Sequence, residues 1–394
     1  MKIFIYCQHV LGLGHYFRTL ELCRALNRHE IVLVSGGPPV QAKLSPTIRE
    51  VRLPQLMMDQ DFSTLLAGDD ASPVDTIKKK RRQMLFGLYK QEKPDVLLVE
   101  LYPFGRRAFA FEIDPLLKGI RKHILPPALV VCSLRDILVG RKKNYQASYE
   151  SKVVNALNQL FDALLIHADP NLIRLDRTFG SLADINIPQI YTGYVAPAPP
   201  PNARRKMRAR LALSEKDKLI VASLGGGRVG EKLLKVVVRA FTLLDRSAAR
   251  RLIMFTGPFM DEKTFAQLQD DASEYIQINR FSPDFISYLA AADLSVSMGG
   301  YNTCMNILAT RVPSLVWPFS QNHEQHIRAE RLAEMGVLAT LKLEDLEPWH
   351  LAARMEQMLS DFERSSHHLD LNGAANAAQW LQKRVAGEKK ASIK

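Results

Sequence analysis

The sequence predicts an α/β protein of two domains, each built on a doubly wound parallel sheet. Short apolar, β-branched runs alternate with amphipathic helical stretches in both halves, and a proline-rich segment separates the halves. Continuous apolar strands that alternate with helices are typical of parallel sheets covered on both faces. A length of 394 residues also exceeds what one compact core usually holds.

Five runs of the first half have the pattern of buried strands: 2–7, 30–35, 95–100, 128–133 and 162–167. Helical patterns cover 16–27 and 149–160, among others. We therefore expect a first Rossmann-like domain at 1–195.

The second half repeats the alternation. Its expected strands are 219–224, 252–256, 275–278, 294–298 and 314–317, and its expected helices are 231–245, 261–271, 284–292, 301–309 and 324–335. Residues 196–202 contain four prolines and predict a stiff linker. We expect a second domain at 203–370, a C-terminal helix and tail at 371–394, and a ligand cleft between the strand carboxyl ends of the two domains.

The composition is that of a soluble globular protein, with 47% hydrophobic residues and a net charge of +12. The basic residues gather most densely at 78–82 and at Arg204, Arg205, Lys206, Arg208 and Arg210. No aromatic residues interleave with them, which argues against nucleic acid. A solvated helix face is the favoured interpretation, with an anionic membrane surface as the alternative. Four scattered cysteines fit a reducing cytoplasm.

The first motif follows the first strand and contains Gly12, Gly14, His15 and Arg18. Glycines let a ligand approach the main chain, and the helix expected from residue 16 directs its amides at the loop. His15 is a candidate general base, because its ordinary pKa lies near neutrality. The alternative is a turn of two glycines with a capping histidine.

The second motif opens a helix after the first strand of the second half and contains Gly225, Gly226, Gly227 and Arg228. It predicts a loop that holds a diphosphate, with Arg228 available to a phosphate. A tight turn without a ligand is the alternative.

The third motif occupies 298–328 and again sets glycines between a strand and a helix. Its candidate ligand-binding residues are Gly299, Gly300, Tyr301, Asn302, Thr303, Asn306 and Gln325. Amides at the start of a helix suit phosphate groups. Three such junctions in one domain exceed what stability requires, so unrelated turns are the weaker hypothesis.

Two metal patterns are disfavoured. Asp59-x-Asp61 does not follow an apolar strand, and His323-x-x-His326 has no third ligand nearby. We therefore expect no metal and no cofactor beyond a nucleotide-sugar co-substrate.

The third motif resembles the donor site of family 28 glycosyltransferases, which include the N-acetylglucosamine transferase that makes lipid II. The motif around His15 fits the same wider set, and 191–195 resembles the strand end before the interdomain linker. Segments 97–105 and 133–138 look like a little-described branch of predicted glycosyltransferases. The resemblance covers nearly the whole chain.

The resemblance implies a GT-B fold, a UDP-sugar donor (an N-acetylhexosamine), and inversion without metal. It places Phe281 beside the base, 299–303 at the diphosphate and Gln325 at the sugar. His15 would face the acceptor, a glycan or a lipid-linked molecule. One departure concerns Asn306, where the family has a glutamate that binds the ribose.

Without metal, the charge on the leaving diphosphate must be met by amides, helix dipoles and cations. His15 is the first candidate for the base and Glu100, at a strand end, is the second. Asp136, at another strand end, would orient His15 or bind the acceptor.

Other functions remain open from the sequence. A UDP-sugar hydrolase would use the same fold and loops, with water as the acceptor. A non-catalytic nucleotide-sugar sensor would fit the change at Asn306, and a 2-epimerase is a weaker candidate. For a transferase we expect a cytoplasmic location, with the inner face of the membrane as the alternative.

Overall fold

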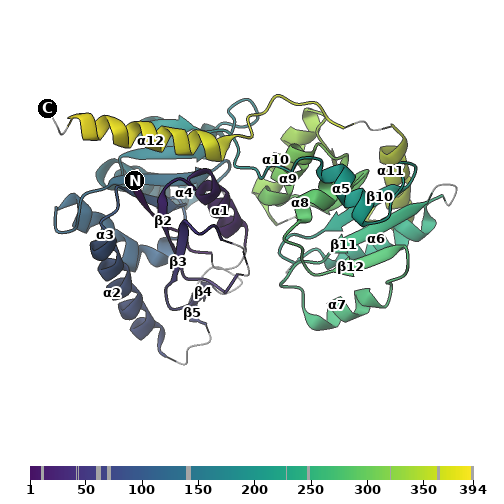
Figure 1. The fold of residues 1–394 in the computed structure, drawn as a ribbon, viewed down its shortest axis with the longest axis horizontal. Coiled ribbons are helices and arrows are strands. Elements are labelled where there is room, and N and C mark those ends of the chain that lie inside the picture. The colour runs from purple at the N-terminus through teal and green to yellow at the C-terminus, as the bar shows by residue number, and fades with distance from the viewer. Residues whose placement is uncertain are drawn as a thin grey trace. The chain divides into compact units, whose positions relative to one another are not determined.

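The computed structural model describes residues 1–9, 13–40, 42, 44–58, 64–68, 72–138, 143–227, 229–245, 249–319, 321–361 and 364–391. The chain divides into two compact units. The first comprises Met1–Val195 together with Asn372–Lys394, and the second comprises Ala196–Leu371. In Figure 1 the C-terminal helix, drawn in yellow, accordingly lies with the purple and blue elements of the first unit.

A seven-stranded parallel sheet forms the centre of the first unit, in the order β3-β2-β1-β6-β7-β8-β9. Its strands are β1 (Lys2–Tyr6), β2 (Glu30–Ser35), β3 (Ile48–Arg52), β6 (Val96–Glu100), β7 (Leu129–Arg135), β8 (Ala163–His167) and β9 (Gln189–Tyr191). A separate antiparallel hairpin contains β4 (Leu56–Met58) and β5 (Leu65–Ala67). The helices are α1 (Gly14–Ala25), α2 (Val74–Glu92), α3 (Ala110–Arg121), α4 (Lys143–Leu160) and α12 (Gly373–Ala391), with 3₁₀ turns at η1 (Arg107–Phe109), η2 (Leu175–Arg177) and η3 (Gly180–Asp184).

The second unit contains a six-stranded parallel sheet in the order β12-β11-β10-β13-β14-β15. Its strands are β10 (Lys218–Ser223), β11 (Arg250–Phe255), β12 (Ile276–Asn279), β13 (Leu294–Met298), β14 (Ser314–Trp317) and β15 (Ala339–Thr340). Its helices are α5 (Ala203–Arg210), α6 (Glu231–Leu243), α7 (Glu262–Gln269), α8 (Phe285–Ala291), α9 (Tyr301–Thr310), α10 (His323–Glu334) and α11 (Pro348–Asp361), with a 3₁₀ turn η4 (Glu344–Leu346). No helix in the described ranges is apolar and long enough to cross a bilayer.

The prediction of two doubly wound parallel sheets is confirmed, and the ten expected strands occur with ends that shift by two residues at most. The sequence pattern missed α2. Its buried stripe is Ile77, Arg81, Leu85, Tyr89 and Glu92, so two charged residues interrupt the apolar period that reveals a helix. The strands β9 and β15 have three and two residues, which is too short for a detectable pattern.

Each sheet has one point where the winding direction of the chain reverses. In the first sheet it lies between β1 and β6, and in the second between β10 and β13. The loops that follow two such strands leave toward opposite faces, and the crevice between them is where ligands bind in this class of sheet. Three of the four loops carry the glycine motifs of the sequence.

The C-terminal helix completes the core of the first unit. On α12, Leu381 and Val385 are buried in the same apolar cluster as Leu20 of α1. Asn376 donates from its side chain to the carbonyl of Thr192 at 2.8 Å. The chain therefore returns to its starting unit after the second unit is finished.

The interpretation of 78–82 as a solvated helix face is wrong for Arg81. Arg81 is fully buried and binds both carboxylate oxygens of Glu112, at 2.6 and 2.9 Å. It also donates to the carbonyl of Pro54 at 2.7 Å and to the side chain of Gln8 at 2.8 Å. This ion pair fastens α2 and α3 to the carboxyl end of β1.

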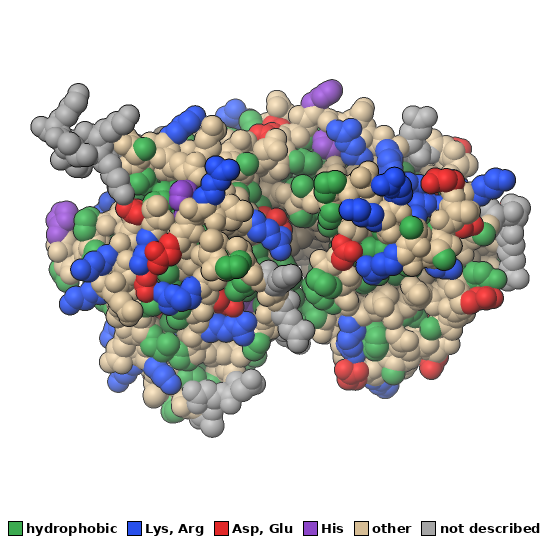
Figure 2. Space-filling view, viewed as in Figure 1, with side chains coloured by type: hydrophobic (Ala, Val, Ile, Leu, Met, Phe, Trp, Pro, Cys, Tyr) green, Lys and Arg blue, Asp and Glu red, His purple; other side chains and the backbone are tan. Residues whose placement is uncertain are grey.

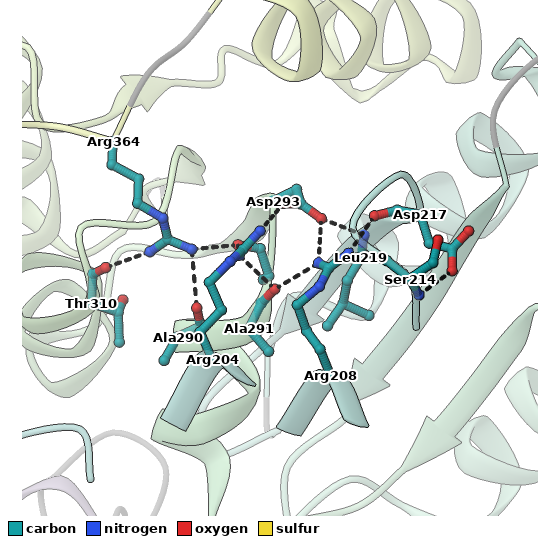
Figure 3. A network of polar contacts seen from close by, with 11 residues as sticks. Arg204, Arg208, Ser214, Asp217, Leu219, Ala290, Ala291, Asp293, Thr310 and Arg364 are labelled. Atoms are coloured by element: carbon teal, nitrogen blue, oxygen red, sulfur yellow. Dashed lines mark hydrogen bonds and ion pairs between the residues drawn. The ribbon is translucent and has the colours of Figure 1, made fainter. Parts of the chain in front are cut away.

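The second basic cluster is also partly structural, as Figure 3 shows. Arg204 and Arg208 reach from α5 to the carbonyl of Ala291, at the end of α8, and to the carboxylate of Asp293. Arg364 donates to further carbonyls around the same helix end. Cations suit the carbonyls of a helix C-terminus. Over the visible face of the molecule, the remaining basic side chains are scattered among acidic ones (Figure 2).

We predict that Arg81→Met destabilises the first unit by about 3–5 kcal/mol, because it leaves the Glu112 carboxylate buried without its cation. Denaturant unfolding measures the change. The control is Arg82→Met, which alters an exposed neighbour on the same helix and should stay within about 0.5 kcal/mol. Equal effects of the two substitutions would contradict the structural role of Arg81.

Candidate functional site

The candidate site of the first unit lies at the carboxyl edge of its sheet, at the reversal between β1 and β6. The helix α1 begins at Gly14, two residues before the predicted start, and carries His15 in its first turn. Leu13 precedes the helix and provides no side-chain cap. Glu100 is the last residue of β6. Gly12 of the predicted acceptor loop lies outside the described residues.

His15 and Arg18 converge on Glu100. Nδ1 of His15 lies 2.6 Å from Oε1 of Glu100, and Nη2 of Arg18 donates to the same oxygen. The side chains of Glu100 and Arg18 are each 2% exposed, whereas that of His15 is 16% exposed. The carboxylate therefore stands behind the imidazole. No hydrogen bond to Nε2 of His15 occurs among the described residues, so this nitrogen can meet a ligand.

Burial, more than the surrounding charges, favours a neutral imidazole at His15. Burial lowers the pKa of His15 to about 3, and Arg106 and Arg18 oppose the attraction that Glu100 exerts. Burial alone would raise the pKa of Glu100, but His15, Arg18 and Arg106 together lower it to about 2. A neutral His15 donates from Nδ1 to the ionised Glu100 and keeps a lone pair on Nε2, which is the protonation state of a general base.

The two predicted carboxylates have different surroundings. The charge of Glu100 is held by His15 and Arg18, so its geometry suits positioning of the imidazole better than proton abstraction. Asp136 is fully buried just after β7, where it accepts from the amide of Ile137 at 2.9 Å. The contact that orients His15 in the structure comes from Glu100.

A buried row of polar side chains continues from this point across the sheet. Nε2 of His167 lies 2.8 Å from the hydroxyl of Ser133, and its Nδ1 lies 2.8 Å from the hydroxyl of Thr192. That hydroxyl donates to the carbonyl of Gly193, so Nδ1–H of His167 is the donor to Thr192 and Ser133 donates to Nε2. Burial lowers the pKa of His167 to about 3, which keeps the row neutral.

The candidate site of the second unit begins with the glycine loop after β10. Gly225, Gly227 and Gly230 have φ of +73°, +86° and +94°, a conformation that other residues adopt rarely. A Cβ on Gly227 would lie 2.4 Å from the carbonyl oxygen of Thr256. Gly226 has no such contact, and Arg228 lies outside the described residues. At Gly227 the glycine is required by close packing as well as by the turn.

The loop after β13 lies beside this glycine loop. Gly300 directly precedes α9, and the first bond of that helix runs from the amide of Cys304 to the carbonyl of Gly300. The amides of Tyr301, Asn302 and Thr303 form the first turn and point toward the carboxyl edge of the sheet. A Cβ on Gly225 would lie 4.0 Å from the hydroxyl oxygen of Thr303, so the two loops are in contact distance.

Gln325 and Asn306 flank this turn. Gln325 stands in the first turn of α10, and its Cβ lies 3.6 Å from the place of a Cβ on Gly299. Its Oε1 accepts from the amide of Phe319 at 3.1 Å, which fixes the side-chain amide beside the loop. Asn306 is half-buried on α9, one turn beyond Asn302.

Phe281 follows β12 at the same edge and is 44% exposed. The carbonyl of the preceding Arg280 accepts from the amide of Gly257 at 2.9 Å. Gly257 in turn packs on the backbone of Gly226 and Gly227. The structure thus gathers the predicted donor residues along one edge of the second sheet.

Two residues of the candidate sites were not identified from the sequence, and two residues of a disfavoured metal pattern lie outside the described ranges. Gly257 supports the glycine loop, and Arg106, after β6, lies within electrostatic reach of His15. The sequence could have indicated Arg106, because this arginine directly follows Gly105 in the loop after the strand that ends at Glu100. Asp59 and Asp61 lie outside the described residues. Among described residues, no group of three His, Cys, Asp or Glu side chains is placed to hold a metal.

Comparisons with known proteins agree with this geometry. Residues 220–383 match the model of the "Glycosyltransferase family 28 C-terminal domain". The UDP-N-acetylglucosamine–N-acetylmuramyl-(pentapeptide) pyrophosphoryl-undecaprenol N-acetylglucosamine transferase of Caldicellulosiruptor saccharolyticus is 29% identical over 182 residues, 44% of this chain and 49% of that protein. The chain thus spans about half the length of that relative. The NDP-glycosyltransferase YjiC of Bacillus subtilis is 24% identical over 360 residues, 89% of this chain and 83% of that protein.

Among solved structures, MurG of Acinetobacter baumannii aligns with a TM-score of 0.52 at 16% identity, over 99% of both chains. The chain has the GT-B fold. The match over residues 220–383, together with the relative from Caldicellulosiruptor, confirms the resemblance to family 28 glycosyltransferases.

We predict that His15 stays neutral between about pH 5 and 8, and that Arg18→Met raises its pKa toward the ordinary 6.5. Removing this cation leaves the Glu100 carboxylate free to stabilise the imidazolium. NMR titration of the imidazole Cε1 proton measures both values. The control Arg24→Met removes an exposed cation from the same helix and should change nothing. If the Arg18 variant titrates like its parent, Arg18 does not set the charge of His15.

Proposed function

We propose that the protein transfers a sugar, an N-acetylhexosamine, from a UDP-sugar to an acceptor hydroxyl, with inversion and without metal. The neutral His15, fixed at Nδ1 by Glu100 and open at Nε2, is the observation that carries the proposal. Such an imidazole can take the proton of a hydroxyl group at neutral pH.

In the proposed reaction the acceptor proton passes to Nε2 of His15, and the acceptor oxygen attacks the anomeric carbon of the donor. The bond between that carbon and the diphosphate oxygen breaks, and UDP departs with both electrons. A single displacement of this kind inverts the anomeric centre. Glu100 stabilises the imidazolium while the proton resides on His15.

The donor half of the proposal rests on the second unit. The start of α9 at Gly300 directs amides and a helix dipole to the edge of the sheet, where the leaving diphosphate would gain charge. The glycine loop 225–227 adjoins this turn and lets phosphates approach the main chain. The relative from Caldicellulosiruptor is named for transfer from UDP-N-acetylglucosamine, which supports the same donor class.

Two residues would define the nucleoside. Phe281, exposed at the end of β12, would lie beside the base. Asn306 would meet the ribose hydroxyls with an uncharged amide in place of the carboxylate that the family uses. An amide can accept one hydrogen bond and donate two, but it contributes no charge.

We predict that His15→Ala retains stabilisation by the UDP-sugar and loses turnover by about 100-fold or more. The donor is first selected by thermal shift in a panel of nucleotide sugars, and turnover is followed as release of UDP. The control His123→Ala removes an exposed histidine of the same unit and should leave both properties unchanged.

The same assay separates the alternative functions. Rapid, stoichiometric release of sugar from the donor without any acceptor would identify a hydrolase. Donor binding without turnover in the parent protein would identify a sensor. Equal turnover of the His15 variant and its parent would remove His15 as the base.

We also propose that the acceptor is a glycan or a lipid-linked molecule, met at an anionic membrane surface on the cytoplasmic side. The relative's name specifies a pyrophosphoryl-undecaprenol acceptor. On α2, Lys79, Lys80 and Arg82 are exposed, and Met84 beside them is 37% exposed. Basic residues near an anionic surface contribute about 1 kcal/mol each.

Vesicles of phosphatidylglycerol should therefore retain the protein at low salt, and neutral phosphatidylcholine vesicles should not. Combining Lys79→Glu, Lys80→Glu and Arg82→Glu should abolish retention. The control makes an equal charge change on exposed lysines of the second unit: Lys216→Glu, Lys232→Glu and Lys263→Glu. If the parent fails to bind at low salt, or if both triple variants behave alike, the membrane proposal is wrong.

A further inference from the structure

The loop that follows β6 ends in an arginine with an unusual backbone. Leu101 and Arg106, at the two ends of this loop, have φ of +66° and +58°. Hydrogen bonds hold the loop in place: the amide of Leu101 donates to the carbonyl of Ser133 at 2.9 Å, and the hydroxyl of Tyr149 donates to that of Phe104 at 2.6 Å. A side chain on such a rigid loop has a fixed origin, next to the end of the strand that carries Glu100.

The guanidinium of Arg106 makes no hydrogen bond and no ion pair with any described residue. Its Nε is buried, whereas the residue as a whole is half-buried. Glu100 is the nearest source of attraction, but its Oε1 is already occupied by His15 and Arg18. Burial lowers the pKa of Arg106, and the nearby Arg135 and Arg18 lower it further. Arginine nonetheless remains charged in proteins.

Two buried arginines of this chain bind protein oxygens. Arg81 has a carboxylate and carbonyl oxygens around its guanidinium, and Arg208 binds Asp293 and the carbonyls of Ser214 and Asp217. Arg106 is half-buried, and no carboxylate or carbonyl of the described residues binds its guanidinium. A partly desolvated cation of this kind favours an anionic ligand.

The position of Arg106 in the fold indicates which ligand could supply an anion. Arg106 follows segment 97–105 directly, and Arg135 belongs to segment 133–138. In the transfer reaction these segments supply Glu100, but the reaction gives no role to the two arginines. The strands β6 and β7 are neighbours, and Arg106 lies within electrostatic reach of both His15 and Arg135.

We propose that Arg106 binds an oxyanion, a carboxylate or a phosphate, carried by the acceptor close to the hydroxyl that His15 deprotonates. The planar guanidinium matches two oxygens of either group, and Arg135 adds positive charge to the same place. A neutral acceptor would leave the guanidinium unpaired, so the site would discriminate against it. The identity of the ligand as an acceptor rests on the proposed transferase function.

A binding experiment tests the anion site without turnover. Inorganic phosphate and acetate are titrated separately into the protein at low salt, and the Cε1 resonance of His15 reports binding beside it. We expect a saturable shift with at least one anion. In Arg106→Met the apparent dissociation constant should rise at least about tenfold, and in Arg106→Lys it should rise less, because a point charge replaces the two-pronged donor.

The control for this experiment is Arg107→Met, which removes the exposed neighbouring cation and should bind like the parent. The lysine variant keeps the charge and so serves if the methionine variant does not fold. An unchanged dissociation constant in both Arg106 variants, or the absence of any saturable shift in the parent, would overturn the proposal.

A second experiment tests the acceptor. With the donor found by thermal shift, kcat/KM is compared for methyl β-glucoside, methyl β-glucuronide and glucose 6-phosphate. We expect an anionic compound to exceed the neutral one by about 100-fold, with the preferred member showing whether carboxylate or phosphate is recognised. In Arg106→Met the ratio of kcat/KM between the anionic and the neutral compound should fall to about one, whatever the absolute rates. A preference that survives in Arg106→Met, or equal rates for all three in the parent, would refute it.

The two experiments fail separately. If no nucleotide sugar is turned over, the transferase proposal fails, but anion binding at Arg106 is still measured by the resonance of His15. If sugar is transferred and neither anion perturbs His15, the transferase stands and the inference about Arg106 is wrong.

Discussion

The contact between the buried carboxylate of Glu100 and its two partners, His15 and Arg18, organises the candidate site of the first unit. The carboxylate ends β6, and both partners belong to the first turns of α1, which follows the neighbouring strand β1. Arg18 keeps Glu100 ionised, and Glu100 fixes the ring of His15. The protonation state of His15 thus depends partly on the ion pair between Glu100 and Arg18, whose side chains solvent hardly reaches. The reversal of winding between β1 and β6 is what brings the three residues together.

Each unit has its candidate site at the point where the winding of its sheet reverses. In the first sheet the candidate groups are side chains, and in the second they are mainly backbone amides and glycines. The glycines at 225, 227 and 230 have positive φ and tight neighbours, so they serve packing and ligand approach together. A tight turn and a phosphate-binding loop were the two interpretations of 225–227, and the same glycine conformations suit both. A residue in such a loop can be essential for stability even where it also touches a ligand.

The sequence predicted the parallel sheets, their order along the chain and the position of the glycine loops, because buried parallel strands and strand–glycine–helix junctions leave local patterns. It did not predict contacts between distant segments. Pairing of His15 with Glu100 spans 85 positions. The burial of Arg81 was also invisible, because a charged residue on a helix normally indicates solvent.

The net charge of +12 was a poor guide to the charge of the outer surface, because several of the charged residues are bound inside their units. Arg81, Arg204, Arg208 and Arg364 are bound to carbonyls and carboxylates within their units, so they contribute little to an outer surface. Asn306 shows the opposite case. Its position on α9 agrees with the sequence, yet its chemistry departs from the family, and a fold does not reveal what a changed side chain recognises.

The return of α12 to the first unit has a consequence for synthesis. The helix covers α1 with Leu381 and Val385, so the apolar surface beneath it stays uncovered until the last residues leave the ribosome. The second unit, by contrast, is complete once residue 371 has emerged. Domains generally fold as units during synthesis. The half of the protein that is made first is therefore the half that finishes folding last.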